Sequence, residues 1–211
     1  LSLVGSEMCI RDSGKVTQVT TTKELIDSET LADFKIKAII LNHNMLAKEF
    51  HKKDKYQDEV DFLVRNESRN RFLKNLALSL NGNTLMLYQF VEKHGKPLYD
   101  QIESTIRNSI DKDRKVFFVS GEVDGNSREE IRHIVEDEEN SIIVASFGTF
   151  STGINIKRLH NIVFCSPSKS RIRVLQSIGR GLRTGEGKQV ATLFDIADNM
   201  AWKSKNCLLY T

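Results

Sequence analysis

The residues best suited to chemistry stand in one short segment near the C-terminal end of the chain, VLQSIGRGLR. Gln176, Arg180 and Arg183 occupy positions i, i+4 and i+7, which places them on one face of a helix. Guanidinium groups bind phosphate oxygens with two parallel hydrogen bonds, and Gly179 and Gly181 remove bulk beside them. The segment therefore predicts a helix that binds a polyanion, although a solvated basic helix face shows the same pattern.

A second segment rich in hydroxyl and glycine residues, VASFGTFSTGINI, lies upstream. Here we expect a strand to run into a loop that contains Ser146, Thr149 and Gly153. Hydroxyl groups and free backbone N–H groups can hold phosphate oxygens. The same residue types also fill ordinary strand-to-helix turns that contact no ligand, so both interpretations stay open for this segment alone.

Short apolar runs that alternate with helical patterns must position these segments. The expected strands are TLMLYQFV, KVFFVS, SIIVAS, NIVFCS and QVATLFDIA. Strands that are apolar on both faces are typical of a parallel sheet covered by helices on both sides, so the sequence predicts an α/β fold. Ligands of such folds bind beyond the carboxyl ends of the strands.

The region before this alternation has its own pattern. Residues 35–43, KIKAIILNH, predict another buried strand, and residues 56–80 predict one or two helices with a polar face. The apolar positions near helical spacing are Phe62, Leu63, Phe72, Leu73 and Leu76.

In their order and spacing, the two chemical segments resemble motifs V and VI of superfamily-two helicases. The second matches the pattern Q-x-x-G-R-x-x-R in full, at Gln176, Gly179, Arg180 and Arg183. LMLYQFVEKHG resembles motif IV, and the resemblance covers about residues 35–205. Within the superfamily the chain is most similar to UvsW-type DNA helicases of T-even-like phages. The resemblance implies a RecA-like parallel sheet with helices on both faces.

The resemblance also implies roles at the ATP site. Arg183 is the expected arginine finger on the γ-phosphate, Arg180 is its partner, and Gln176 orders their helix at the nucleotide cleft. Gly153 and Asn155 match the G-x-D segment of motif V that reaches the ribose, with an amide in place of the frequent carboxylate. The nucleotide-binding positions are thus Gln176, Gly179, Gly153 and Asn155.

Other positions resemble those that hold the backbone of one nucleic-acid strand. They are Ser146, Thr149, Gln89, Phe90, Gly121 and Lys169, and Arg171 and Arg173 would widen the basic track. For Phe90 a place in the core is the competing interpretation, and for Lys169 and the two arginines it is a solvated face. The expected partner is single-stranded or branched DNA, with RNA as the alternative.

The phosphate-binding pattern G-x-x-x-x-G-K-[ST] is absent from the 211 residues. Gly148 and Gly153 have its spacing, but Ile154 and Asn155 follow them. No D-E-x-H or D-E-A-D segment occurs either. Because these parts hold the phosphates and Mg²⁺ in such motors, we expect an N-terminal RecA-like half to supply them and this chain to be inactive alone.

Residues 81–203 are expected to form the RecA-like domain, and residues 14–80 a connecting strand and helices that lead into it. Residues 1–13 and 207–211 are interpreted as non-native sequence from read assembly.

The formal charge of +3 suits nucleic acid but is also ordinary for a soluble domain. Without a run of about 18 apolar residues, a cytoplasmic protein with no membrane contact is expected, in the host cell if a phage encodes it.

Three other function classes compete with the helicase motor half of a DNA remodelling enzyme. The chain is alternatively a non-catalytic nucleic-acid-binding module, or the motor of an RNA helicase or restriction enzyme. An unrelated doubly wound nucleotide-binding enzyme would need a G-x-G-x-x-G turn after its first strand, which is absent. The three cysteines form no C-x-x-C pair, so neither a disulfide framework nor a metal site is predicted.

Overall fold

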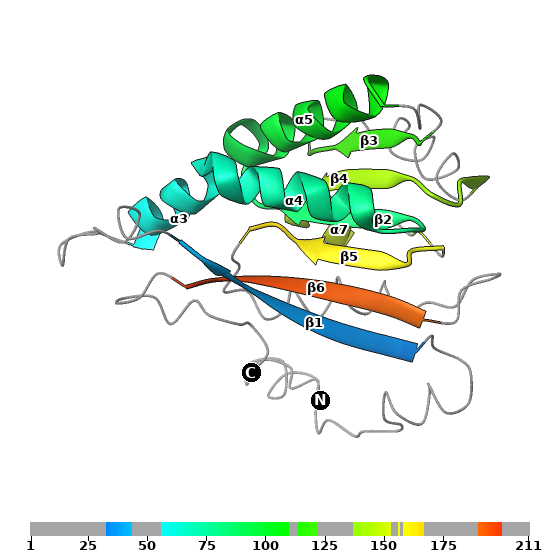
Figure 1. Cartoon of the computed structure of the whole chain (residues 1–211), viewed down its shortest axis with the longest axis horizontal. Helices are drawn as coiled ribbons and strands as arrows, with labels where there is room; N and C mark the ends of the chain where they lie inside the picture. Colours follow the sequence, from blue (N-terminus) through cyan, green and yellow to red (C-terminus); the bar gives the residue numbers. More distant parts are fainter. Residues whose placement is uncertain are drawn as a thin grey trace, which may run out of the picture.

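The core of the protein is a six-stranded, entirely parallel sheet (Figure 1). The structure is a computed structural model that describes residues 33–43, 56–109, 114–121, 137–152, 156, 158–166 and 190–199. The strand order is β1-β6-β5-β2-β4-β3. The strands are β1 (Asp33–Asn42), β2 (Thr84–Tyr88), β3 (Val116–Val119), β4 (Ile142–Ser146), β5 (Asn161–Phe164) and β6 (Val190–Asn199). The predicted parallel α/β fold is confirmed.

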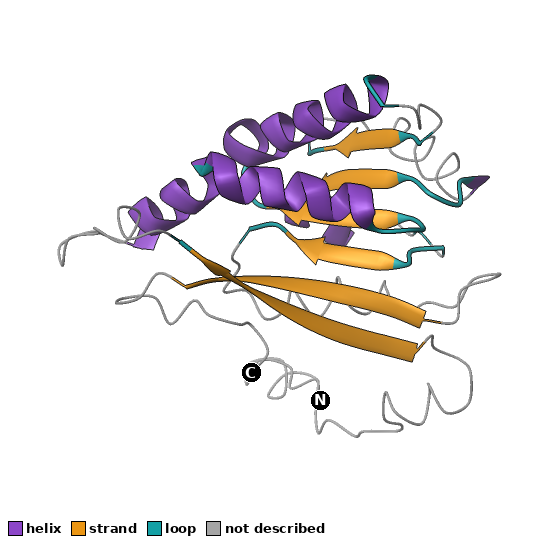
Figure 2. Cartoon of the chain, in the orientation of Figure 1, coloured by secondary structure: helices purple, strands orange, loops and turns teal. Residues whose placement is uncertain are grey.

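Helices cover both faces of this sheet (Figure 2). The helical elements are α3 (Tyr56–Arg65), α4 (Glu67–Ser79), the π-helix η2 (Val91–Gly95), α5 (Lys96–Arg107) and α7 (Phe147–Thr152). Helices α4 and α5 pack on one face, and α7 packs on the other. The prediction of one or two helices in residues 56–80 is confirmed: there are two, α3 and α4. They are separated by Asn66, whose side chain caps α4 by accepting the Arg69 N–H at 2.9 Å.

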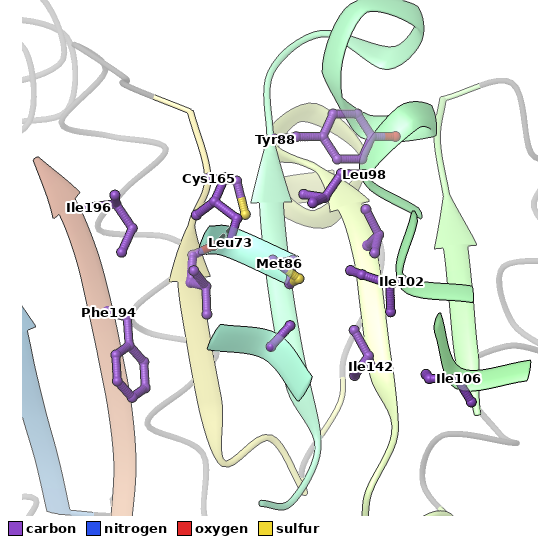
Figure 3. Packing of buried hydrophobic residues seen from close by; sticks show 13 residues of the cluster. Leu73, Met86, Tyr88, Leu98, Ile102, Ile106, Ile142, Cys165, Phe194 and Ile196 are labelled. Carbon is purple, nitrogen blue, oxygen red and sulfur yellow. Dashed lines mark hydrogen bonds between the residues drawn. The ribbon is translucent and has the colours of Figure 1, made fainter. Parts of the chain in front are cut away.

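Alternation along the central strand explains the two layers of core. In β2, Leu85 and Leu87 face the α7 side, whereas Met86 and Tyr88 face α4 and α5. The α5 residues that meet this second face stand one helical turn apart, and Figure 3 shows them beside Met86 and Ile142. They are Leu98, Ile102 and Ile106. A continuously apolar strand is therefore buried on both sides.

Two details differ from the sequence predictions. Residues 33–42 do form a strand, β1, but it is an edge strand rather than a buried one. Within the described part of the chain β1 pairs with β6 alone, and its Ile36 and Ile40 side chains are 49% and 53% exposed. Residues 147–152, predicted as a loop, form the short helix α7 directly after β4.

Candidate nucleic-acid and nucleotide interface

The carboxyl ends of all six strands meet at one edge of the sheet because the strands are parallel. Of the predicted nucleic-acid-binding residues, those within the described ranges all lie at this edge: Gln89, Phe90, Gly121, Ser146 and Thr149. The remaining predicted positions lie outside the described residues, so their assignments stay predictions. They are Lys169, Gln176, Gly179, Arg180, Arg183, Gly153 and Asn155, together with Arg171 and Arg173.

Ser146 and Thr149 bond to each other at the start of α7. Their hydroxyl oxygens are 2.7 Å apart, and the Thr149 N–H donates to the Ser146 Oγ at 3.1 Å. The two residues are 9% and 5% exposed. They therefore cap a helix, as in the ordinary strand-to-helix turn considered above. Gly121, after β3, lies next to this turn, since a Cβ added there would be 3.8 Å from the Thr149 Oγ1.

The residues after β2 present one polar side chain to solvent. Gln89 is exposed, whereas Phe90 is half-buried and belongs to neither core cluster. The backbone N–H of Gln89 donates to the Ser166 hydroxyl, which follows β5, at 3.2 Å. The turn after β2 is thus attached to the end of the neighbouring strand.

His94, in η2, connects the same hydroxyl to α4. Its fully buried ring places Nδ1 2.9 Å from the Ser166 Oγ and Nε2 3.1 Å from the Asn70 Oδ1. The Asn70 Nδ2 donates in turn to the Val64 carbonyl at 2.9 Å. Burial, and after it the charge of Arg69, lowers the pKa of His94 from 6.5 to about 3. The ring is therefore neutral near neutral pH.

A buried ion pair joins the carboxyl ends of β1, β5 and β6. The Arg69 Nε donates to both carboxylate oxygens of Asp198, at 2.9 and 3.1 Å, and its Nη1 donates to the Cys165 carbonyl at 2.6 Å. The His43 Nε2 lies 2.9 Å from the same carboxylate. Burial alone raises the pKa of Asp198, but the bond to His43 and the charge and bond of Arg69 outweigh it and lower that pKa.

Sequence reasoning missed this buried polar network. Its members stand far apart in the chain, and each belongs to a segment that is otherwise read as helix or strand. One signal was available: Arg69 and Asp198 are ionisable residues within or directly after an apolar pattern. Such a position indicates a buried charge, and a buried charge requires a partner. Which residues pair was not visible from spacing.

Comparisons with known proteins agree with the fold. Residues 68–185, more than half of the chain, match the helicase conserved C-terminal domain. The chain belongs to this helicase family. The match begins in α4 and includes β2 to β5 and the Q-x-x-G-R-x-x-R pattern.

The helicase domain is similar to the ATP-dependent DNA helicase uvsW of Enterobacteria phage T4, at 36% identity over 199 residues. That alignment covers 92% of this chain but 38% of the relative, so the chain spans less than two-fifths of the relative's length. The crystal structure of T4 UvsW superimposes with a TM-score of 0.65 at 34% identity, covering 86% of this chain and 35% of that one. The resemblance to UvsW-type helicases and the RecA-like fold are thereby confirmed.

A more distant structure shows the fold alone. The restriction-modification enzyme LlaBIII bound to DNA has a TM-score of 0.54 at 16% identity, over 81% of this chain and 12% of that one.

Two further properties concern the described residues of the helicase domain. None of their helices has the length and apolar character of a membrane span, and they hold no group of three or more potential metal-binding side chains.

Proposed function

We propose that this chain is the C-terminal motor half of an ATP-dependent DNA helicase or translocase that remodels branched or duplex DNA. The observation that carries the proposal is the family match over residues 68–185, which contains Gln176, Gly179, Arg180 and Arg183 in full agreement with the motif VI pattern. The similarity to a DNA helicase supports DNA as the substrate. ATP would bind between this domain and an N-terminal RecA-like half that holds Mg²⁺.

In the proposed cycle, ATP on the N-terminal half draws the two halves together. Arg183 and Arg180 then contact the γ-phosphate and stabilise the charge that develops during transfer, while Gly153 and Asn155 contact the ribose. Hydrolysis and product release reopen the cleft. Closure and opening change the grip of this domain on one DNA strand.

The DNA-binding part of the proposal rests on the residues at the carboxyl edge of the sheet. Gln89 and Gly121 are exposed there, so we assign them the direct contacts with the DNA backbone. Ser146 and Thr149 are buried and hydrogen-bonded to each other. We therefore infer that they stabilise the turn beside Gly121 and do not contact DNA directly. Lys169 would add a phosphate contact.

The test uses the gene that contains this sequence, recovered in full from its source by sequencing across both ends. Its purified product should hydrolyse ATP in the presence of DNA, and Arg183→Ala should lower that rate by about 10³ to 10⁵ while DNA binding stays largely intact. Arg107→Ala is the matched control, because this exposed arginine at the end of α5 pairs only with the neighbouring surface Glu103 in the described contacts. An Arg183→Ala rate within tenfold of wild type refutes the finger assignment.

A further inference from the structure

The turn that follows β2 is held by hydrogen bonds on both of its residues. The Gln89 N–H donates to the Ser166 Oγ at 3.2 Å. The carbonyl of Phe90 accepts the backbone N–H groups of His94 and Gly95, at 3.2 and 2.9 Å. The π-helix η2 is therefore hydrogen-bonded directly to the turn that carries the exposed Gln89 side chain. Single-turn π-helices of this kind occur often at functional sites.

The side chains behind the turn form one directed chain of hydrogen bonds. Its two ends fix the direction, because the Gln89 N–H can only donate and the Val64 carbonyl can only accept. Asn70 donates to Val64 through Nδ2, so its Oδ1 accepts from the Nε2–H of His94. The His94 Nδ1 is then an acceptor and takes the Ser166 hydroxyl proton. In this one arrangement each polar atom from Gln89 to Val64 has a hydrogen-bond partner.

We propose that His94 is a positioning residue for nucleic-acid binding: through Ser166 it fixes the backbone at Gln89 and so presents that side chain to the DNA strand. This inference rests on the proposed function. The lowered pKa of the buried ring agrees with it, because a neutral imidazole has the one acceptor nitrogen that Ser166 requires.

Two substitutions of His94 separate a positioning role from a merely structural one. Asparagine places its polar group near the Nδ1 position and keeps the link to Ser166, whereas glutamine reaches the Nε2 position and keeps the link to Asn70. Each variant leaves one buried partner unsatisfied, so both should lose similar stability. Only His94→Gln breaks the connection to Gln89. Ser166→Ala breaks it from the other side and serves if His94→Gln does not fold.

The matched control lies at the opposite edge of the sheet. There the His160 Nδ1 accepts the backbone N–H of Asn83 at 3.1 Å, which is a similar bond at the amino ends of β2 and β5, far from their carboxyl ends. His160→Ala should lower stability without changing the β2 turn. The measurements on the full chain are the Kd for a fluorescein-labelled oligodeoxythymidine, the amide exchange rate at Gln89 by NMR, and the urea midpoint.

We expect His94→Gln and Ser166→Ala to raise the Gln89 exchange rate and to weaken oligonucleotide binding about three- to tenfold, the equivalent of one hydrogen bond. His94→Asn and His160→Ala should stay within about twofold of wild type in Kd. Unchanged exchange at Gln89 in His94→Gln and Ser166→Ala, or equal weakening in His160→Ala, overturns the inference. If the wild-type chain binds no oligonucleotide, the proposed function fails, and the exchange rate still decides whether His94 holds this turn.

Discussion

The buried His94 ring gives the stability of this domain a specific dependence on pH. In the folded chain its pKa is about 3, and in the unfolded chain it returns to about 6.5. Because the folded pKa is depressed, the unfolded chain binds a proton below about pH 6.5 and the folded chain does not. The contribution of His94 to stability is therefore complete above pH 6.5 and is lost as the pH falls toward 3.

The size of the effect follows from the two pKa values. Each pH unit within this window changes the free energy of unfolding by at most about 1.4 kcal/mol. Between about pH 7.5 and pH 5 the His94 contribution should fall by roughly 2 kcal/mol. The lowered pKa of Asp198 acts in the same direction, but its ordinary value is 3.8, so its effect falls below this range.

The assay is urea unfolding of the wild-type chain and of His94→Gln at several pH values across this range. The variant has a lower free energy of unfolding near neutral pH, so the slopes with pH are compared rather than the absolute values. The two proteins share every other side chain, so the difference between their slopes reports His94. The wild type should lose about 2 kcal/mol more than the variant between pH 7.5 and 5. Parallel pH profiles would refute the claim that the ring is held neutral by burial.

Three further predictions concern packing and charge. Gly95→Ala should lower the free energy of unfolding by about 1 to 3 kcal/mol in urea titrations, because its Cβ would overlap the buried Tyr88 ring; a loss under about 0.5 kcal/mol contradicts the packing. Asp198→Asn should cost about 3 to 5 kcal/mol in the same assay, since it leaves the Arg69 charge buried without its partner; a neutral effect means that the pair is not formed. Burial raises the pKa of Cys165 to about 12, so iodoacetamide at about pH 8 should alkylate it only after unfolding, as read by peptide mass spectrometry; rapid labelling of the folded chain would show that the β5 end is open.

The elements of the central sheet were predictable because their residues encode burial locally. The runs TLMLY, VFFV and IIVAS are apolar apart from Thr84 and Ser146 at their ends, and such runs occur where helices cover both faces of a parallel sheet. Residues 33–42 are also largely apolar, and the pattern alone did not distinguish an edge strand from a buried one. That difference depends on strand order, which is set by contacts between segments far apart in the chain.

The site was predictable in part for a similar reason. Gln89, Gly121 and Ser146 could be assigned to one edge, since each follows or ends a strand of one parallel sheet. The engagement of Ser146 with Thr149 was not predictable, because the same residue types serve both helix caps and phosphate loops. The pairing of Arg69 with Asp198 joins positions 129 residues apart, and no local pattern indicates it.

The measurement that tests the central claim most directly is the ATP hydrolysis rate of the full-length gene product, with and without single-stranded DNA. If this domain is the C-terminal half of a DNA-dependent motor, hydrolysis should be readily measured and should rise on addition of DNA. A full-length product that binds DNA but hydrolyses no ATP would contradict the motor assignment and leave a nucleic-acid-binding module.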